Sequence, residues 1–258
     1  MTDTKSHPQF SAEVVLPVPP FTGRIQQLAY GPDGRDADIY LPATQQALPV
    51  VVFVTGYPDP GFKAMTGLSQ RDIAQTVSWA KLLCSAGIAA VSYSAIEPVA
   101  DGLRVLSWLK TEGRSLGIDP ARIGLWSCSG NVPTTLTLLQ QDAALRCALL
   151  LYGFTLDLDG GTAVLQAAAQ FRFANSADPE QFVPAELPLM LLRAGQDQFA
   201  GLNAAMDSFV ATALARNCSV SLINYPQGVH CFDILDGGPE SRRCVAAGLT
   251  FLQRQLSF

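Results

Sequence analysis

The sequence has few charged residues and no basic cluster. Of its 258 residues, 15% are Asp, Glu, Lys or Arg, and the formal net charge is −5. Proteins that bind nucleic acids or other polyanions carry patches of Lys and Arg, because these side chains attract phosphate groups. The composition therefore argues against a nucleic-acid partner.

Long apolar runs and closely paired cysteines are also missing. Residues 1–8 have no apolar core of signal-peptide length, and no later stretch reaches membrane-spanning length without a charge or a proline. The six cysteines are widely spaced, with no C-x-x-C pair for metal or redox chemistry. We therefore expect a cytoplasmic protein with reduced, buried thiols, no membrane partner, and no metal or organic cofactor.

What the sequence does contain is a regular alternation of strand and helix patterns. Hydrophobic residues make up 48% of the chain, which is enough for a substantial core. Strands are expected at 24–30, 37–41, 50–54, 88–93, 123–128, 145–152, 187–193 and 219–225, and helices at 73–86, 99–116, 132–140, 164–171, 201–216 and 240–255. The first two strands are expected to pair antiparallel around a turn at 31–34, and the Gly- and Pro-rich stretch 56–67 to be a loop.

This alternation predicts an α/β fold with a mostly parallel central sheet and helices on both faces. We expect one domain over residues 24–258, preceded by a lead segment at 1–23. The irregular stretch 153–186 is too short for more than a minimal cap. Ligands of such folds bind beyond the carboxyl ends of the strands, so candidate functional residues are sought there.

The turn after the fifth expected strand has the pattern of an elbow that exposes a serine. A nucleophile on such an elbow needs small or φ-permissive residues two positions before and two positions after it. Around Ser129 these are Ser127, which is small, and Asn131, which belongs to the residue types that tolerate positive φ. Around Cys128 the first would be Trp126, whose indole would collide with the turn. Ser129 is the candidate nucleophile; the alternative is an ordinary serine at a helix start.

A serine hydroxyl needs a base to remove its proton, and histidine is the usual one. The sequence has two histidines. His7 lies in the polar N-terminal tail, whereas His230 directly follows the last expected strand, at the edge of the sheet where Ser129 is expected. His230 is therefore the candidate base; the alternative is a loop histidine without a role.

An imidazole base needs a carboxylate that holds its tautomer and stabilises its charged form. Asp197 follows the strand at 187–193 and would lie in the same loop layer as His230. The alternative for Asp197 is an Asx turn or a helix cap. Asp233 and Asp101 are weaker rivals, because the first is close in sequence to His230 and the second is expected to open the helix at 99–116.

The chain order Ser129, Asp197, His230 is the order of an α/β-hydrolase triad. The segment Ala-Arg-Ile-Gly-Leu-Trp at 121–126, the Ala-Gly-x-Asp unit ending at Asp197 and the Tyr-Pro-x-Gly-x-His unit ending at His230 accompany it. Together they resemble the dienelactone hydrolase and carboxylesterase branch of the α/β-hydrolase superfamily, from Arg24 to the C-terminus.

The sequence departs from this pattern at Ser127 and Asn131, where glycines are usual, and at Thr55, where relatives often have histidine. The resemblance implies a single-domain α/β-hydrolase fold. It also implies that the backbone N–H groups of Tyr57 and Gly130 stabilise the oxyanion of the reaction.

The residues and the resemblance together predict a serine hydrolase that cleaves small carboxylic esters or lactones through an acyl-enzyme on Ser129. The short irregular stretch favours compact acyl groups over long lipid chains. A peptidase or an acyltransferase could use the same residues. A catalytically silent binding protein is the alternative from another class, and the sequence leaves a homodimer open.

Overall fold

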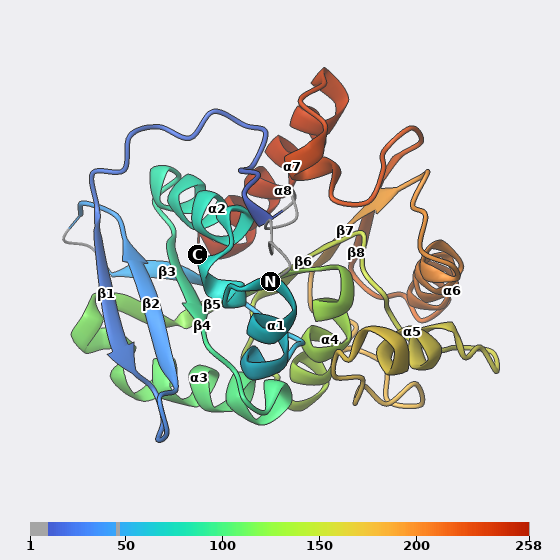
Figure 1. Cartoon of the computed structure of the whole chain (residues 1–258), viewed down its shortest axis with the longest axis horizontal. Helices are drawn as coiled ribbons and strands as arrows, with labels where there is room; N and C mark the ends of the chain where they lie inside the picture. Colours follow the sequence, from blue (N-terminus) through green and yellow to red (C-terminus); the bar gives the residue numbers. More distant parts are fainter. Residues whose placement is uncertain (1–9, 45–46, 258) are drawn as a thin grey trace, which may run out of the picture.

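A sheet of eight strands forms the centre of the computed structural model, which describes residues 10–44 and 47–257 (Figure 1). The strands are β1 (Arg24–Ala29), β2 (Asp36–Leu41), β3 (Leu48–Phe53), β4 (Ala89–Tyr93), β5 (Ile118–Cys128), β6 (Cys147–Leu151), β7 (Leu189–Ala194) and β8 (Val220–Tyr225). Their order across the sheet is β1-β2-β4-β3-β5-β6-β7-β8. The β1–β2 and β2–β4 pairs are antiparallel, and all pairs from β4 to β8 are parallel. The mostly parallel sheet predicted from the sequence is confirmed.

Helices cover both faces of the sheet (Figure 1). The helices of one face are α2 (Ala74–Ser85) and α8 (Pro239–Leu256), and those of the other face are α3 (Pro98–Glu112), α4 (Val132–Gln141) and α6 (Leu202–Ala215). In β3, Val50 and Val52 pack in the core on the second face, while Val51 and Phe53 pack in the core on the first. A central strand buried on both faces needs a continuous apolar sequence, and the run at 50–54 supplies it.

Shorter helices connect these layers. They are α1 (Asp59–Thr66), α5 (Ala163–Phe171) and α7 (Phe232–Leu235), with 3₁₀ helices at Gln70–Asp72, Gly113–Leu116 and Ser129–Asn131. Helix α5 confirms the short helix expected within 153–186, the stretch between β6 and β7.

Helix α1 corrects the loop expected over residues 56–67. Proline is tolerated in the first turn of a helix, where the N–H groups have no intrahelical partner, and Pro60 lies there. Gly67 ends the helix with a left-handed φ of 82°. The Gly and Pro residues therefore mark the ends of a helix rather than the absence of one. Helix α7 and the early start of β5 at Ile118 were also not expected.

Part of the lead segment packs against the domain. Val14 is buried, its N–H donates a hydrogen bond to Ser78 Oγ on α2, and the N–H of Val15 donates one to the carbonyl of Asp233. No helix among residues 10–44 and 47–257 combines the length and the apolar character needed to cross a membrane.

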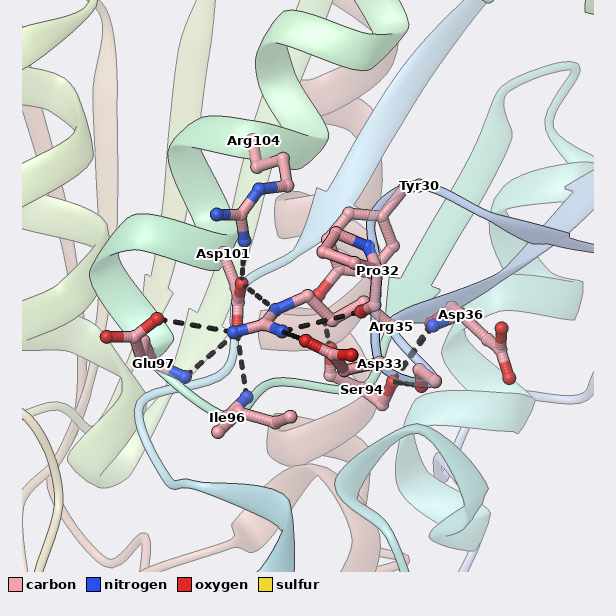
Figure 2. A network of polar contacts seen from close by, with 11 residues as sticks. Tyr30, Pro32, Asp33, Arg35, Asp36, Ser94, Ile96, Glu97, Asp101 and Arg104 are labelled. Carbon is pink, nitrogen blue, oxygen red and sulfur yellow. Dashed lines mark hydrogen bonds and ion pairs between the residues drawn. The ribbon is translucent and has the colours of Figure 1, made fainter.

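An ionic cluster attaches the β1–β2 turn to the start of α3 (Figure 2). Asp101 on α3 is fully buried, and its Oδ1 accepts hydrogen bonds from Arg35 Nε at 2.7 Å and from Arg104 Nη1. Its Oδ2 accepts the backbone N–H groups of Ile96 and Glu97, both at 2.8 Å. Asp101 thus opens α3 as expected, and it also fixes the loop that follows β4.

Candidate active site

Ser129 lies on a sharp turn at the end of β5 and has a φ of 55°. This left-handed conformation is uncommon for a residue with a side chain and marks local backbone strain. The sequence analysis looked for φ tolerance at Asn131, but Asn131 has a φ of −84°. The turn is therefore made at the serine itself, and the residue two positions later has ordinary helical geometry.

Ser127 and Asn131, which stand where glycines are usual, both have hydrogen-bonding partners. Asn131 Oδ1 accepts the N–H of Gly56 at 2.7 Å, which connects the turn to the loop after β3. Ser127 is fully buried, and its Oγ accepts a hydrogen bond from Thr135 Oγ1 on α4 at 2.7 Å. Both polar side chains therefore support the turn.

The carboxyl ends of three strands bring the candidate residues together. His230 Nε2 lies 2.9 Å from Ser129 Oγ, and His230 Nδ1 lies 2.6 Å from Asp197 Oδ2. Ser129 follows β5, Asp197 follows β7 and His230 follows β8. This is an unbroken chain of hydrogen bonds from carboxylate to imidazole to hydroxyl. His7 lies outside the described residues.

Aromatic rings and one backbone group hold this arrangement in place. The His230 ring is contacted edge-on by Tyr152, with centroids 4.8 Å apart, and by Phe199, with centroids 4.6 Å apart. The side chain of Asp197 is fully buried, and its Oδ1 accepts the N–H of Phe199 at 3.0 Å. Asp197 thus forms the Asx turn considered as its alternative while its other oxygen faces His230.

The two rival carboxylates lie elsewhere. Asp101 belongs to the ionic cluster described above. Asp233 is fully buried and accepts hydrogen bonds from Tyr152 Oη at 2.6 Å, and from Gln75 Nε2 and Trp79 Nε1 at 2.8 Å each. Burial raises the pKa of Asp233, and these three donors partly offset that effect.

Tyr152 links Asp233 to the imidazole, because its hydroxyl bonds the carboxylate and its ring contacts His230. The sequence analysis did not select it. Its place directly after β6, at the carboxyl edge of the sheet, is the signal that pointed to it.

Cys128 does not take part in the chain of hydrogen bonds. It is buried, its Sγ lies 3.8 Å from Gln75 Oε1, and burial raises the pKa of its thiol. A neutral, enclosed thiol is a poor nucleophile. All six cysteines are free, and Cys231 alone among them is partly exposed.

The two loops expected to carry the oxyanion donors touch each other. A Cβ atom added to Gly56 would lie 2.5 Å from the carbonyl oxygen of Gly130, and one added to Gly130 would lie 2.4 Å from Tyr57 Oη. Only glycine permits this approach. The structure therefore brings the segment containing Tyr57 beside the residue that follows Ser129.

A metal site is not evident in the described part of the chain. Among residues 10–44 and 47–257, no three His, Cys, Asp or Glu side chains gather closely enough to ligate an ion.

Comparisons with known proteins identify the fold. No protein-family model and no curated protein matches the sequence. Among solved structures, the chain resembles EstE1, a thermostable carboxylesterase cloned from a metagenomic library, with a TM-score of 0.70 and 14% identity over 94% of this chain and 92% of that one. A bacterial heroin esterase matches with a TM-score of 0.70 and 16% identity over 93% and 86% of the two chains. The esterase LipW from Mycobacterium marinum matches with a TM-score of 0.68 and 17% identity over 92% of this chain and 83% of that one.

These likenesses, together with the sheet order, define the class: the chain has a single-domain α/β-hydrolase fold. At such identities they describe the fold, and the chemistry has to be argued from the site itself.

Proposed function

We propose that this protein is a serine hydrolase that cleaves small carboxylic esters. The observation that carries the proposal is the chain of hydrogen bonds from Asp197 through His230 to Ser129 Oγ. The names of the structural neighbours, a carboxylesterase and two esterases, agree with ester hydrolysis. The cap contains one short helix, α5, which favours compact substrates over long lipid chains.

In the proposed reaction, Ser129 Oγ attacks the acyl carbon while His230 Nε2 takes the hydroxyl proton. The buried carboxylate of Asp197 stabilises the imidazolium that forms. The N–H groups of Tyr57 and Gly130 hold the developing oxyanion. His230 then gives the proton to the leaving alcohol. A water molecule, deprotonated by His230, attacks the acyl-enzyme in the same way, and the acid is released.

The experiment is labelling with a fluorophosphonate. Ser129 Oγ displaces fluoride from phosphorus, and the stable adduct resembles the tetrahedral intermediate. We expect digestion and mass spectrometry to find the adduct on Ser129, and Ser129→Ala to lose about 10⁴- to 10⁶-fold in turnover of p-nitrophenyl acetate. His230→Ala should prevent labelling, whereas Cys128→Ala should not.

Other results would assign the protein differently. An adduct on Cys128 would indicate a thiol enzyme. A folded protein without an adduct would indicate a catalytically silent binding protein. Transfer of the acyl group to an amine or alcohol in preference to water would indicate an acyltransferase.

A further inference from the structure

A hollow of about 570 Å³ lies between α5 and the segment that follows β7. Cavities that bind small molecules usually have volumes of about 300–1,000 Å³. Two other hollows, of about 450 and 440 Å³, are lined by residues at the amino ends of β6, β7 and β8. The hollow beside α5 is at the carboxyl edge of the sheet, where ligands of parallel sheets bind.

Two residues that line the hollow also contact residues of the proposed site. Phe199, which lines it, contacts the His230 ring at 4.6 Å between centroids. Phe154, which also lines it, donates its backbone N–H to the carbonyl of Ser129 at 3.3 Å. Tyr57 and Phe173 contact one another at 5.9 Å between centroids over Gly130, on the side expected to hold the oxyanion.

This position selects the part of the ester that would occupy the hollow. In the mechanism proposed above, His230 Nε2 gives its proton to the leaving oxygen. The alcohol group carried by that oxygen therefore lies next to the imidazole, which is in contact with Phe199 of the hollow's lining.

The lining indicates the chemistry of the group. Phe199 contacts Phe154 edge-on at 6.4 Å between centroids and Phe171 edge-on at 5.4 Å. An aromatic ring in the hollow would extend this cluster, in which edge-to-face contacts are favourable.

The remaining lining side chains are small or carry neutral amides. Gln166 and Gln170 come from successive turns of α5, and Gln198 comes from the segment after β7. Every residue that lines the hollow is uncharged, and its three glutamines are exposed to solvent, so an anionic group would find no counter-ion there.

We propose that this hollow binds an uncharged aromatic alcohol group, and hence that the substrates are neutral arylmethyl or aryl esters of short acids. The inference rests on the proposed ester hydrolysis and adds the class of leaving group. Esters whose alcohol part bears a carboxylate should therefore react more slowly.

The test compares two acetate esters that differ by one charge, benzyl acetate and 4-carboxybenzyl acetate, with ethyl acetate as a reference. Acid release is followed by pH-stat titration. We expect kcat/KM for benzyl acetate to exceed that for the carboxylated ester by about 100-fold, which is the order of discrimination that a pocket achieves against a poorly matched group.

Variants on α5 assign this selectivity to the hollow. Gln170→Arg places a cation on its lining, so the ratio should fall at least about tenfold through faster turnover of the anionic ester. Leu165→Arg is the matched control, because it adds the same charge to the same helix at a side chain that is 59% exposed and does not line the hollow. Its ratio should stay within about twofold of the parent value.

Phe171→Leu removes an aromatic ring from the lining and keeps an apolar side chain. It should lower kcat/KM for benzyl acetate about tenfold relative to that for ethyl acetate, mainly through KM.

Each outcome is distinguishable. If ethyl acetate is hydrolysed in a Ser129-dependent reaction but the two benzyl esters react equally well, the inference about the hollow is wrong and the proposed function stands. An equal response to Gln170→Arg and Leu165→Arg would also overturn it. If none of the esters is hydrolysed and the fluorophosphonate does not react, the proposed function itself fails.

Discussion

Two buried aspartates at the same edge of the sheet have opposite surroundings. Asp101, near the β1–β2 turn, is bonded by two guanidinium groups and two backbone N–H groups, so both of its oxygens are occupied and its charge is neutralised (Figure 2). Asp197, after β7, is bonded by one backbone N–H and by the imidazole of His230. The first carboxylate holds loops together. The second is free to respond to a change of charge on a single partner.

Burial alone does not distinguish a carboxylate that holds loops together from one that faces a proposed catalytic histidine. Both side chains are fully buried and both follow a strand of the central sheet. What differs is the partner: a guanidinium keeps its proton at all accessible pH values, whereas an imidazole gains and loses one near neutrality. A carboxylate paired with an imidazole can therefore stabilise the positive charge that the ring gains when it takes up a proton.

The largest expected effect is the loss of kcat in a variant of Asp197. Asp197→Asn removes the charge that stabilises the imidazolium and favours the wrong tautomer of His230, so kcat on p-nitrophenyl acetate should fall by about 10⁴-fold. The midpoint of thermal unfolding should change little. If Asp101→Asn or Asp233→Asn causes the larger loss of kcat, Asp197 is not the acid of the triad.

The reverse pattern is expected for Asp101→Asn. Asp101→Asn removes the only buried carboxylate that pairs with the buried Arg35 among the described residues, so Tm should fall by on the order of 10 °C. At a temperature where the variant is folded, kcat/KM should remain within about threefold of the parent value. Asp33→Asn is the control, because that carboxylate is 81% exposed in the same cluster and its loss should leave Tm nearly unchanged. Calorimetry and initial rates measure both effects, and equal Tm values for the two variants would contradict the assignment.

A smaller effect on stability is expected from Asp233. It is buried like Asp101 and Asp197, but its partners are the neutral donors Tyr152, Gln75 and Trp79. Burial raises its pKa above the value of about 3.9 that an unfolded chain has, so the folded state holds this proton more tightly than the unfolded state. The contribution of Asp233 to stability therefore decreases as pH rises through the interval between these two pKa values. Urea titrations measure the free energy of unfolding of the parent and of Asp233→Asn. The value for the parent minus the value for the variant should decrease from pH 4.5 to pH 8. A difference that grows with pH would show that the donors around Asp233 outweigh its burial.

The smallest effect concerns Asp236, a few residues further along. Its pKa is lowered by hydrogen bonds from the Tyr225 hydroxyl at 2.6 Å and from the N–H of Gly238 at 2.8 Å. The stabilisation is therefore present above the unfolded pKa and is lost as pH falls through the folded one. Tyr225→Phe should raise the pKa of Asp236 toward its ordinary value, as followed by NMR of the carboxyl carbon. An unchanged titration would leave the Gly238 N–H as the sole cause.

Much of the fold followed from local patterns. The alternating elements were recognised because apolar periodicity and Gly or Pro boundaries depend on neighbouring residues, as at the buried run 50–54. Helix α1 was missed because its Pro and Gly residues resemble a loop when their positions relative to the helix ends are unknown. Strand ends and chain order predicted the candidate site residues. Tyr152 also follows a strand end, but its contact with His230 depends on packing, and no local pattern marks the hollow beside α5.

The sequence by itself determined the alternation of elements and the order Ser129, Asp197, His230 along them, because both are properties of the linear chain. Tertiary structure alone decided which aspartate meets the histidine. His230 lies 101 residues from Ser129 and 33 from Asp197, so these contacts depend on how β5, β7 and β8 align within the sheet. It also decided that the strained φ falls on Ser129 and that Phe154, Phe171 and Phe199 gather beside His230. Packing between distant segments sets such features, and it is not encoded in any single stretch of sequence.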